Sequence, residues 1–213
     1  MSRSTAFALL AVALAAVAAI VFFRFGAAPE EVAVTEEPAA TEATSEGVNY
    51  GLEIDVAGEA NGTIVIDLFE DTAPLHTAQI VNIANQGLYD GVVFHRVIEG
   101  FMAQTGDVEF GRADGDLARA GMGGSDLPNI PAEFSKQNFD RAIVGMARAQ
   151  DPNSANSQFF IMFAEGPFLN ENYTIVGKVT SGMEVVDQIK RGTGANGAVV
   201  GAPDVMTDVR VTE

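Results

Sequence analysis

Two adjacent residues near the middle of the chain, His95 and Arg96, have side chains that could do chemistry. They interrupt an otherwise apolar run, VVFHRVI, which extends from Val92 to Ile98. Neighbouring side chains of a β-strand point to opposite faces, so His95 and Arg96 leave neither face of this run cleanly apolar. Because an unpaired buried guanidinium is strongly destabilising, we expect Arg96 either to be paired or to open onto water beside apolar neighbours.

Other catalytic groups are few. The chain has no cysteine, which excludes disulfides, cysteine nucleophiles and thiolate metal sites. Its two histidines, His76 and His95, share no metal-ligand spacing, so we expect no metal and no cofactor. For His76, which falls in a predicted helix, we expect a solvent-facing or capped structural role. No Gly-x-Ser-x-Gly motif is present, and a hydrolase would have to use His95 as its general base.

The overall charge bears on the choice of partner. The chain has 12 Lys and Arg against 29 Asp and Glu, which gives a formal net charge of −17 at pH 7. Nucleic-acid binding depends on clustered Lys and Arg that neutralise phosphates, and the sequence contains no such cluster. We therefore expect no nucleic-acid partner.

Short strands must hold His95 and Arg96 in place. Alternating or β-branched apolar runs, separated by Gly, Asn, Asp or Pro, predict these strands. The run with Arg96 is expected to pair with the next strand through a turn at Glu99 and Gly100. The other predicted strands cover residues 52–58 and 62–70, which form a hairpin, and residues 141–147, 157–163, 173–179 and 204–211.

Two helices and one long loop lie between these strands. Residues 72–87 and 182–192 have apolar side chains at helical spacing; Thr72 can cap the first helix, and Pro74 suits its first turn. Residues 107–132 are rich in Gly, Asp and Pro and predict a functional or mobile surface loop. Eight short strands with two helices favour a mainly β domain, an antiparallel sheet closed into a barrel, over a parallel α/β sheet.

The N-terminus differs from the rest of the chain. Residues 6–23, AFALLAVALAAVAAIVFF, carry no charge, are flanked by Arg3 and Arg24, and are long enough to span a bilayer. We expect residues 1–25 to be an uncleaved membrane anchor. A cleaved signal peptide is the alternative, although its best site, at residues 26–28, is followed by proline. In both cases the folded domain would be exported.

Residues 26–50 predict an acidic disordered linker. This segment has six glutamates, no basic residue and a high content of Pro, Ala and Thr. Such a composition cannot bury enough apolar surface to offset chain entropy, and its like charges keep it extended. The folded domain is then expected over residues 51–213.

Several separated motifs carry a specific family resemblance. FHRVIEGFMAQTGD (residues 94–107), GMA (145–147), NSQFFI (156–161) and FLNENYTIVGKV (168–179), in this order, resemble cyclophilin-type peptidyl-prolyl cis-trans isomerases. The resemblance runs from about Leu52 to Glu213. It implies an eight-stranded antiparallel barrel capped by two helices, without a cofactor. It also implies an enzyme that isomerises X–Pro bonds in peptides and in unfolded protein clients; we expect a monomer.

The resemblance also implies roles for individual residues. Arg96 matches the catalytic arginine, which would donate to the prolyl nitrogen, and Gln104 matches the polar residue that bonds the substrate and supports this arginine. His95 matches a histidine that lines the groove. The apolar pocket for the proline ring would comprise Phe101, Met102, Phe160 and Leu169, and further groove positions would be Ala147, Arg148, Gln158, Phe168 and Tyr173. Phe159, on the other face of its strand, is assigned to the core.

The sequence departs from the family pattern at four places. Phe168 stands where a tryptophan is common and lacks the indole donor that bears on cyclosporin sensitivity. Tyr173 replaces a frequent histidine, as in bacterial forms, and Arg148 replaces a frequent asparagine at a position that would act through its backbone. Residues 108–120 are longer than in compact members, and their purpose is not evident from the sequence.

These features favour an isomerase of the cell envelope. It would be anchored in the inner membrane with its domain in the periplasm, or free in the periplasm if the N-terminal segment is cleaved. Two alternatives remain open. One is a chaperone module that binds proline-containing segments without needing turnover, and the other is the hydrolase that uses His95 as base.

Overall fold

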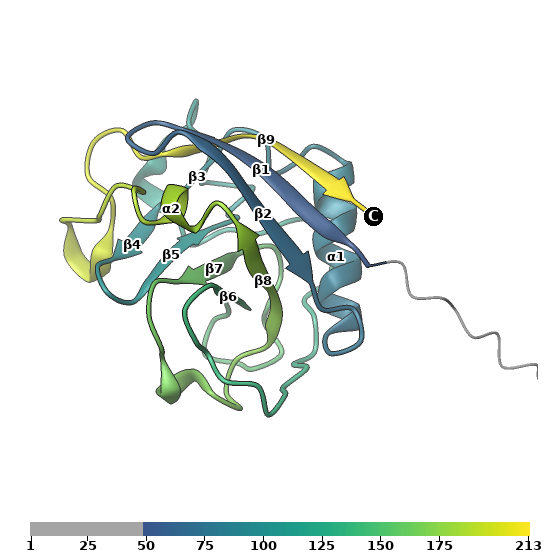
Figure 1. Cartoon of the computed structure of the whole chain (residues 1–213). Helices are drawn as coiled ribbons and strands as arrows, with labels where there is room; N and C mark the ends of the chain where they lie inside the picture. Colours follow the sequence, from purple (N-terminus) through teal and green to yellow (C-terminus); the bar gives the residue numbers. More distant parts are fainter. Residues whose placement is uncertain (1–48) are drawn as a thin grey trace, which may run out of the picture. The chain divides into compact units, whose positions relative to one another are not determined.

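The computed structural model describes residues 49–213 (Figure 1). The strands are β1 (Gly51–Ala57), β2 (Gly62–Leu68), β3 (Val92–Val93), β4 (Arg96–Ile98), β5 (Met102–Thr105), β6 (Ile143–Met146), β7 (Phe159–Met162), β8 (Ile175–Ser181) and β9 (Val205–Thr212). The helices are α1 (Pro74–Asn85) and α2 (Met183–Val186), with 3-10 helices at Leu117–Arg119, Pro167–Leu169 and Ala195–Gly197. The predicted anchor and almost all of the predicted linker lie outside the described residues. Within residues 49–213, no helix combines the length and the apolar character needed to cross a membrane.

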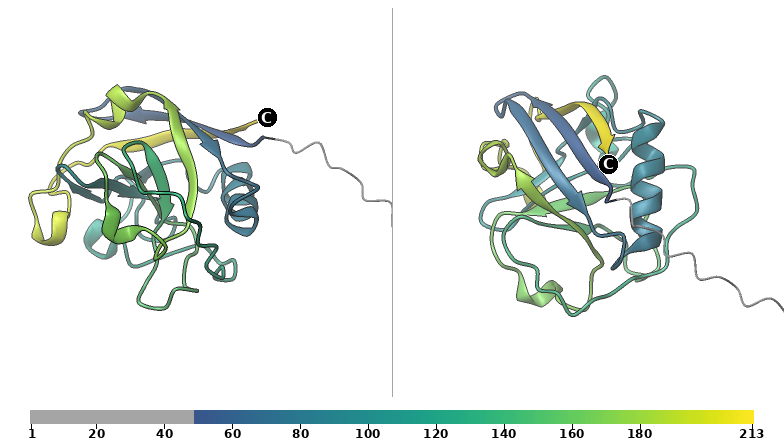
Figure 2. Two further views of the ribbon diagram at one scale, coloured as in Figure 1. Left: turned by 60° about the horizontal axis from the view of Figure 1, so that its bottom comes forward. Right: turned by 45° about the vertical axis from the view of Figure 1, so that its right-hand side comes forward.

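The strands form one antiparallel, strongly curled sheet in the order β3-β9-β1-β2-β8-β6-β7-β5-β4 (Figure 2). The expectation of a closed eight-stranded barrel is therefore wrong in strand number and in closure. The run from Val92 to Ile98 splits into β3 and β4, the two ends of a nine-stranded half-barrel. The split occurs because the Phe94 N–H donates to the Asp204 carbonyl (2.9 Å) and the His95 carbonyl accepts from the Val199 N–H (3.0 Å).

The main apolar core fills the concave side of the sheet. In β1, Leu52, Ile54 and Val56 are buried and alternate with more exposed residues, as the period of a half-buried strand requires. Helix α1 covers part of this core and contributes the buried Ile80 and Ile83 (Figure 1). The predicted hairpin of β1 and β2 and the predicted first helix are both present.

The N-terminus of α1 is capped by Glu133, which directly follows the long loop predicted at residues 107–132. The expectation that Thr72 caps this helix is wrong: the N-cap residue is Ala73, and no local side chain makes a capping hydrogen bond. Instead the Glu133 carboxylate accepts the N–H groups of Leu75 and His76, at 3.1 Å each, and contacts Nδ1 of His76 at 2.5 Å. His76 is fully buried rather than solvent-facing, and with Glu133 it fastens the loop to the helix.

Strand β7 is buried on both faces and separates the main core from a second apolar cluster. Phe159 and Ile161 belong to the main core, and Phe160 and Met162 belong to the second cluster. The other buried members of the second cluster are Met102, Phe139, Ile143, Leu169 and Ile175. The assignment of Phe159 to the core is confirmed, and this second cluster forms the base of the site described below.

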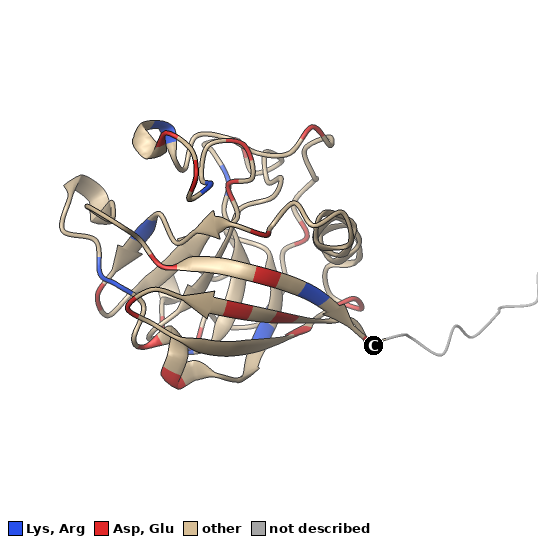
Figure 3. Ribbon diagram, turned by 90° about the horizontal axis from the view of Figure 1, so that it is seen from above, with Lys and Arg blue, Asp and Glu red and all other residues tan. Residues whose placement is uncertain are grey.

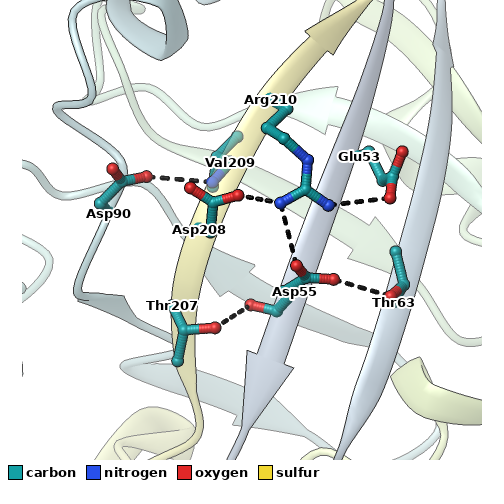
Figure 4. Close-up of polar contacts among 8 residues, drawn as sticks. All are labelled: Glu53, Asp55, Thr63, Asp90, Thr207, Asp208, Val209 and Arg210. Carbon is teal, nitrogen blue, oxygen red and sulfur yellow. Dashed lines mark hydrogen bonds and ion pairs between the residues drawn. The ribbon is translucent and has the colours of Figure 1, made fainter.

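The outer face of β1, β2 and β9 carries charged residues between the core positions (Figure 3). Arg210 pairs with Glu53 (2.8 Å) and Asp55 (3.0 Å) of β1 and with Asp208 of its own strand (Figure 4). The Thr63 hydroxyl of β2 donates to Asp55 at 2.7 Å, and this bond together with Arg210 lowers the pKa of Asp55. Each exposed ion pair contributes little, so we assign this network to the solvated side of the sheet and not to a site.

The long segment 108–120 covers the outer edge of β3. Arg112 forms an isolated antiparallel bridge with Val92, and the Val93 N–H donates to the Gly111 carbonyl at 2.8 Å. An uncovered edge strand can pair with other chains. The segment thus protects one end of the sheet, a role that the sequence does not reveal.

Candidate active site

Arg96 lies on β4, and its guanidinium donates to acceptors on the neighbouring strand β5 and on a turn about 100 positions later in the sequence. Its Nη1 donates to Oε1 of Gln104, its partner in the β4–β5 register, at 3.1 Å. Its Nε donates to the Asn196 carbonyl at 2.9 Å, and its Nη2 donates to Oδ1 of Asn196 at 3.3 Å. Nη1 also donates to the Met102 sulfur at 3.9 Å. A guanidinium has five N–H donors, so one remains on Nη2 that finds no acceptor among the described residues. Partial burial lowers the pKa of Arg96, although an arginine stays charged at neutral pH.

A chain of hydrogen bonds orients the amide that faces Arg96. Nε2 of Gln104 donates to Oε1 of Gln158 at 2.9 Å, and Nε2 of Gln158 donates to the Gly123 carbonyl at 2.8 Å. Each amide therefore presents its oxygen toward Arg96 and its nitrogen away from it. The relay fixes Gln104 as an acceptor for the guanidinium.

The loop that ends this relay is fastened by Asp107. Its buried carboxylate accepts four backbone N–H groups, from Glu109 (3.1 Å), Phe110 (2.9 Å), Gly121 (2.7 Å) and Gly123 (3.0 Å). A carboxylate is the acceptor best able to satisfy so many donors at once. The position of the Gly123 carbonyl, and through it the relay to Arg96, thus depends on Asp107.

An apolar cavity of about 590 Å³ opens beside Arg96. Met102 and Phe160, at 1% and 5% exposed, form its buried base together with Leu169. Phe168 stands at its mouth with 68% of its surface exposed, and its ring centroid lies 5.3 Å from that of Phe101. The remaining lining residues are Gln104, Ala147, Arg148, Asn172 and Tyr173. The cavity therefore has an apolar base, and two arginines, Arg96 and Arg148, are among its lining residues.

Arg148 and Tyr173 form one wall of this cavity. The guanidinium of Arg148 lies over the ring of Tyr173, at 4.4 Å from its centroid, and donates to the Asn172 carbonyl at 3.0 Å. It also donates to the carbonyls of Ala149 (3.0 Å) and Gln150 (3.2 Å). These contacts hold the Arg148 side chain along the wall.

Two polar hollows flank the apolar cavity. One, of about 540 Å³, shares Gln104, Ala147 and Arg148 with the cavity and is otherwise lined mainly by residues 121–125 and 154–158. The other, of about 480 Å³, lies on the far side of Arg96 and Gln104 and is lined also by His95, residues 120–122 and residues 195–198. The two hollows and the apolar cavity all share Gln104 as a lining residue and therefore adjoin one another.

His95 lies in the second hollow and not in the apolar cavity. The ring is 8% exposed, and neither of its nitrogens makes a well-formed hydrogen bond with a described residue. Burial lowers the pKa of His95, while Asp107, the Val93 carbonyl and Gln158 oppose this effect. No serine or carboxylate within residues 49–213 is bonded to the ring in the manner of a Ser–His–Asp triad. Nor does this part of the chain place three or more His, Asp or Glu side chains so that they could hold a metal ion.

The structure brings the residues implied by the resemblance together around the apolar cavity and the two adjoining hollows. Ten of the twelve line the apolar cavity: Arg96, Phe101, Met102, Gln104, Ala147, Arg148, Phe160, Phe168, Leu169 and Tyr173. The other two, His95 and Gln158, lie in the flanking hollows. Sequence reasoning missed Asn172, Asn196 and Asp107. The Asn-Gly pair at residue 196 is a turn signal, but nothing in the sequence indicates that this turn reaches Arg96.

Comparison with known families and proteins gives a consistent result. The family model described as cyclophilin type peptidyl-prolyl cis-trans isomerase/CLD matches residues 52–211. A protein of Brucella suis biovar 1 (strain 1330), named "Probable peptidyl-prolyl cis-trans isomerase", is 60% identical over 146 residues, which cover 68% of this chain and 74% of that protein.

Solved structures show the same fold. A cyclophilin type peptidyl-prolyl cis-trans isomerase of Cryptosporidium parvum is 25% identical, with a TM-score of 0.66 over 78% of this chain and 99% of that one. A second crystal structure of that protein, obtained in the presence of the dipeptide Ala-Pro, is also 25% identical and gives a TM-score of 0.64 over 76% of this chain and 99% of the other.

Proposed function

This chain belongs to the cyclophilin-type peptidyl-prolyl cis-trans isomerases, and we propose that it accelerates X–Pro isomerisation by donating a hydrogen bond from Arg96 to the prolyl nitrogen. The enzyme class follows from the family. The mechanism is supported above all by one observation: Arg96 lines an apolar cavity, and one of its Nη2 protons has no acceptor within residues 49–213.

The chemistry of the reaction explains why such a site suffices. Amide resonance holds the X–Pro bond planar, with a rotation barrier of about 18–20 kcal/mol, and no bond has to be made or broken. In the twisted transition state the prolyl nitrogen regains its lone pair. A donor aimed at that nitrogen therefore stabilises the transition state more than either planar ground state.

The neighbouring residues would prepare Arg96 and the substrate for this step. Gln104 and Asn196 occupy the other edges of the guanidinium and restrict its rotation. The proline ring would pack on Met102, Phe160 and Leu169, which exclude water from the reacting amide. The flanking hollows would receive the residues on either side of the proline.

Replacement of Arg96 tests the mechanism. A charge-assisted hydrogen bond contributes roughly 1.5–3 kcal/mol, so Arg96→Ala should lower kcat/KM about ten- to a hundredfold on a proline-containing peptide. Arg96→Lys keeps the charge but loses the planar fork and should give an intermediate rate. Arg112→Ala, on the loop that covers β3, is the matched control and should leave the rate unchanged. An Arg96→Ala enzyme with wild-type kcat/KM would exclude this mechanism.

The chaperone alternative makes a different prediction for the same variant. Three adjoining hollows could hold an extended proline-containing segment without turnover. In that case Arg96→Ala would keep its ability to suppress client aggregation, and filling the cavity by Ala147→Trp would abolish it. A mass measurement on the incubated peptide separates both functions from the hydrolase alternative, which alone predicts cleavage.

The proposal also covers the substrates of this enzyme and its location in the cell. We assign proline-containing peptides and unfolded proteins as substrates, in keeping with the Ala-Pro dipeptide used with the Cryptosporidium relative. We also propose that the protein is a monomer. The apolar run at residues 6–23 and the acidic segment after it favour a tether to the inner membrane, with the domain in the periplasm. The N-terminal sequence of the mature protein, isolated from membranes, would distinguish this anchor from a cleaved signal.

A further inference from the structure

The turn at residues 195–198 contacts Arg96 through both its backbone and a side chain. Asn196 lies 100 positions away from Arg96 in the sequence, yet its carbonyl accepts Nε of Arg96 at 2.9 Å and its Oδ1 accepts Nη2 at 3.3 Å. Two further contacts hold the guanidinium: Nη1 donates to Oε1 of Gln104 at 3.1 Å and to the Met102 sulfur at 3.9 Å. Asn196 and Gln104 therefore hold the guanidinium at different edges.

The backbone of this turn has the conformation that allows both contacts. Asn196 has φ 55° and ψ 27°, and Gly197 has φ 79°, which are close to the values of a type I′ turn. The Ala198 N–H closes the turn on the Ala195 carbonyl at 3.2 Å. Asparagine tolerates the left-handed region better than most residues with a side chain, and it also offers an acceptor oxygen there.

The turn is seated directly on β4 (Figure 1). Ala198 forms an antiparallel bridge with Arg96, and the Gly192 N–H donates to the Val97 carbonyl at 2.9 Å. At Gly197 a Cβ atom would lie 2.3 Å from Cγ1 of Ile98, so only glycine permits this approach. The position of Asn196 relative to the guanidinium is thus fixed by packing and does not depend on a free loop.

From these contacts we infer that Asn196 is a positioning residue for the isomerisation: it aims the free Nη2 donor of Arg96 into the apolar cavity. The inference rests on the proposed function of Arg96. Asn196 lines the hollow behind the guanidinium and not the apolar cavity, so it acts through Arg96 and not on the proline ring.

The test compares variants of Asn196 in the purified full-length chain. Asn196→Gly keeps the left-handed turn and the backbone acceptor and removes the side chain that carries Oδ1, so it should fold. Loss of one hydrogen bond to a charged donor should lower kcat about three- to tenfold and leave KM unchanged, since a mis-aimed donor affects the transition state more than substrate binding. Asn196→Asp keeps the acceptor and the turn and should stay within about twofold of the wild-type rate. Asn61→Gly, the same replacement in the β1–β2 turn, should have no effect.

A double-mutant cycle separates this inference from the proposed function. When Arg96 is already alanine, Asn196→Gly should cause no further loss. An equal loss in both backgrounds, or no loss in either, would overturn the positioning role. If Arg96→Ala alone leaves the rate unchanged, the proposed mechanism fails. The inference is then judged by the solvent exchange of the Arg96 Nη2 protons, measured by NMR, which should be faster in Asn196→Gly than in the wild type because the bond to Oδ1 is lost. Unchanged exchange would overturn it.

Discussion

At the scale of single residues, Phe168 is the position where the apolar cavity is most open. Its ring is 68% exposed and touches the cavity only at its mouth, beside Phe101. Phe168→Trp adds an indole N–H at this rim, and one neutral hydrogen bond contributes about 0.5–1.5 kcal/mol. We expect the inhibition constant for cyclosporin to fall about two- to tenfold, with peptide turnover nearly unchanged.

Two controls show whether the indole donor is responsible. Phe168→Leu keeps an apolar side chain without a donor and should not improve inhibition. Phe134→Trp introduces the same ring at another exposed aromatic position, just after the long loop, and should have no effect. If Phe168→Leu and Phe168→Trp changed the inhibition constant equally, the donor would not be the cause.

The sequence predicts this site as far as its contacts are local or belong to a recognisable motif. Arg96 and Gln104 lie eight positions apart on a predicted pair of strands, so their contact follows from the strand register. The contact with Asn196 spans 100 positions and depends on how a turn packs against β4. Asp107 resembles an ordinary loop acid in the sequence. Its role appears only when four backbone N–H groups from separate turns converge on it.

At the scale of elements, the long loop depends on this one carboxylate. Asp107→Asn leaves one acceptor oxygen where two now serve four N–H groups, and it turns two donors toward a buried, donor-rich site. We expect the free energy of unfolding to fall by about 2–4 kcal/mol, since the variant leaves buried N–H groups unpaired. Urea denaturation monitored by circular dichroism measures this change.

Another aspartate of the same loop provides the control. Asp116 accepts a single exposed N–H, that of Ala118, at the start of the 3-10 helix Leu117–Arg119. Asp116→Asn should therefore change stability by less than about 1 kcal/mol. Equal losses at the two positions would mean that burial and the number of donors at Asp107 are unimportant.

The elements themselves were predictable where periodicity is local. The β1–β2 hairpin and α1 follow from alternation and helical spacing, and both are present. The break between β3 and β4 was not predictable, because it depends on bonds from Asp204 and Val199 to an apparently continuous run. Similarly, α2 ends after one turn, and the chain that follows bends to Asp204, whose carboxylate accepts the Lys190 N–H at 2.6 Å.

At the scale of the whole molecule, two buried histidines link stability to pH. Burial lowers the pKa of His76 and of His95 below 6.5, even though Glu133 and Asp107 lie close to their rings. A histidine with a lower pKa in the folded state binds fewer protons there than in the unfolded state. Its contribution is thus fully present above pH 6.5 and is lost as the pH falls through the folded pKa. Each histidine can lower the free energy of unfolding by up to about 1.4 kcal/mol per pH unit.

Urea unfolding between pH 7 and pH 5 tests this linkage, because the two aspartates with lowered pKa values titrate below that range. The pKa values of Asp55 and Asp187 are lowered from 3.8, by Thr63 and Arg141 respectively, so their contributions are lost only at more acid pH. His76→Gln and His95→Gln each remove one group that titrates between pH 7 and pH 5. Each should therefore flatten the slope of the free energy of unfolding against pH, whatever its effect on stability at pH 7. The variant with the steeper remaining slope keeps the histidine that contributes more to the pH dependence of unfolding. A double variant that kept the wild-type slope would show that other groups govern the acid sensitivity of the fold.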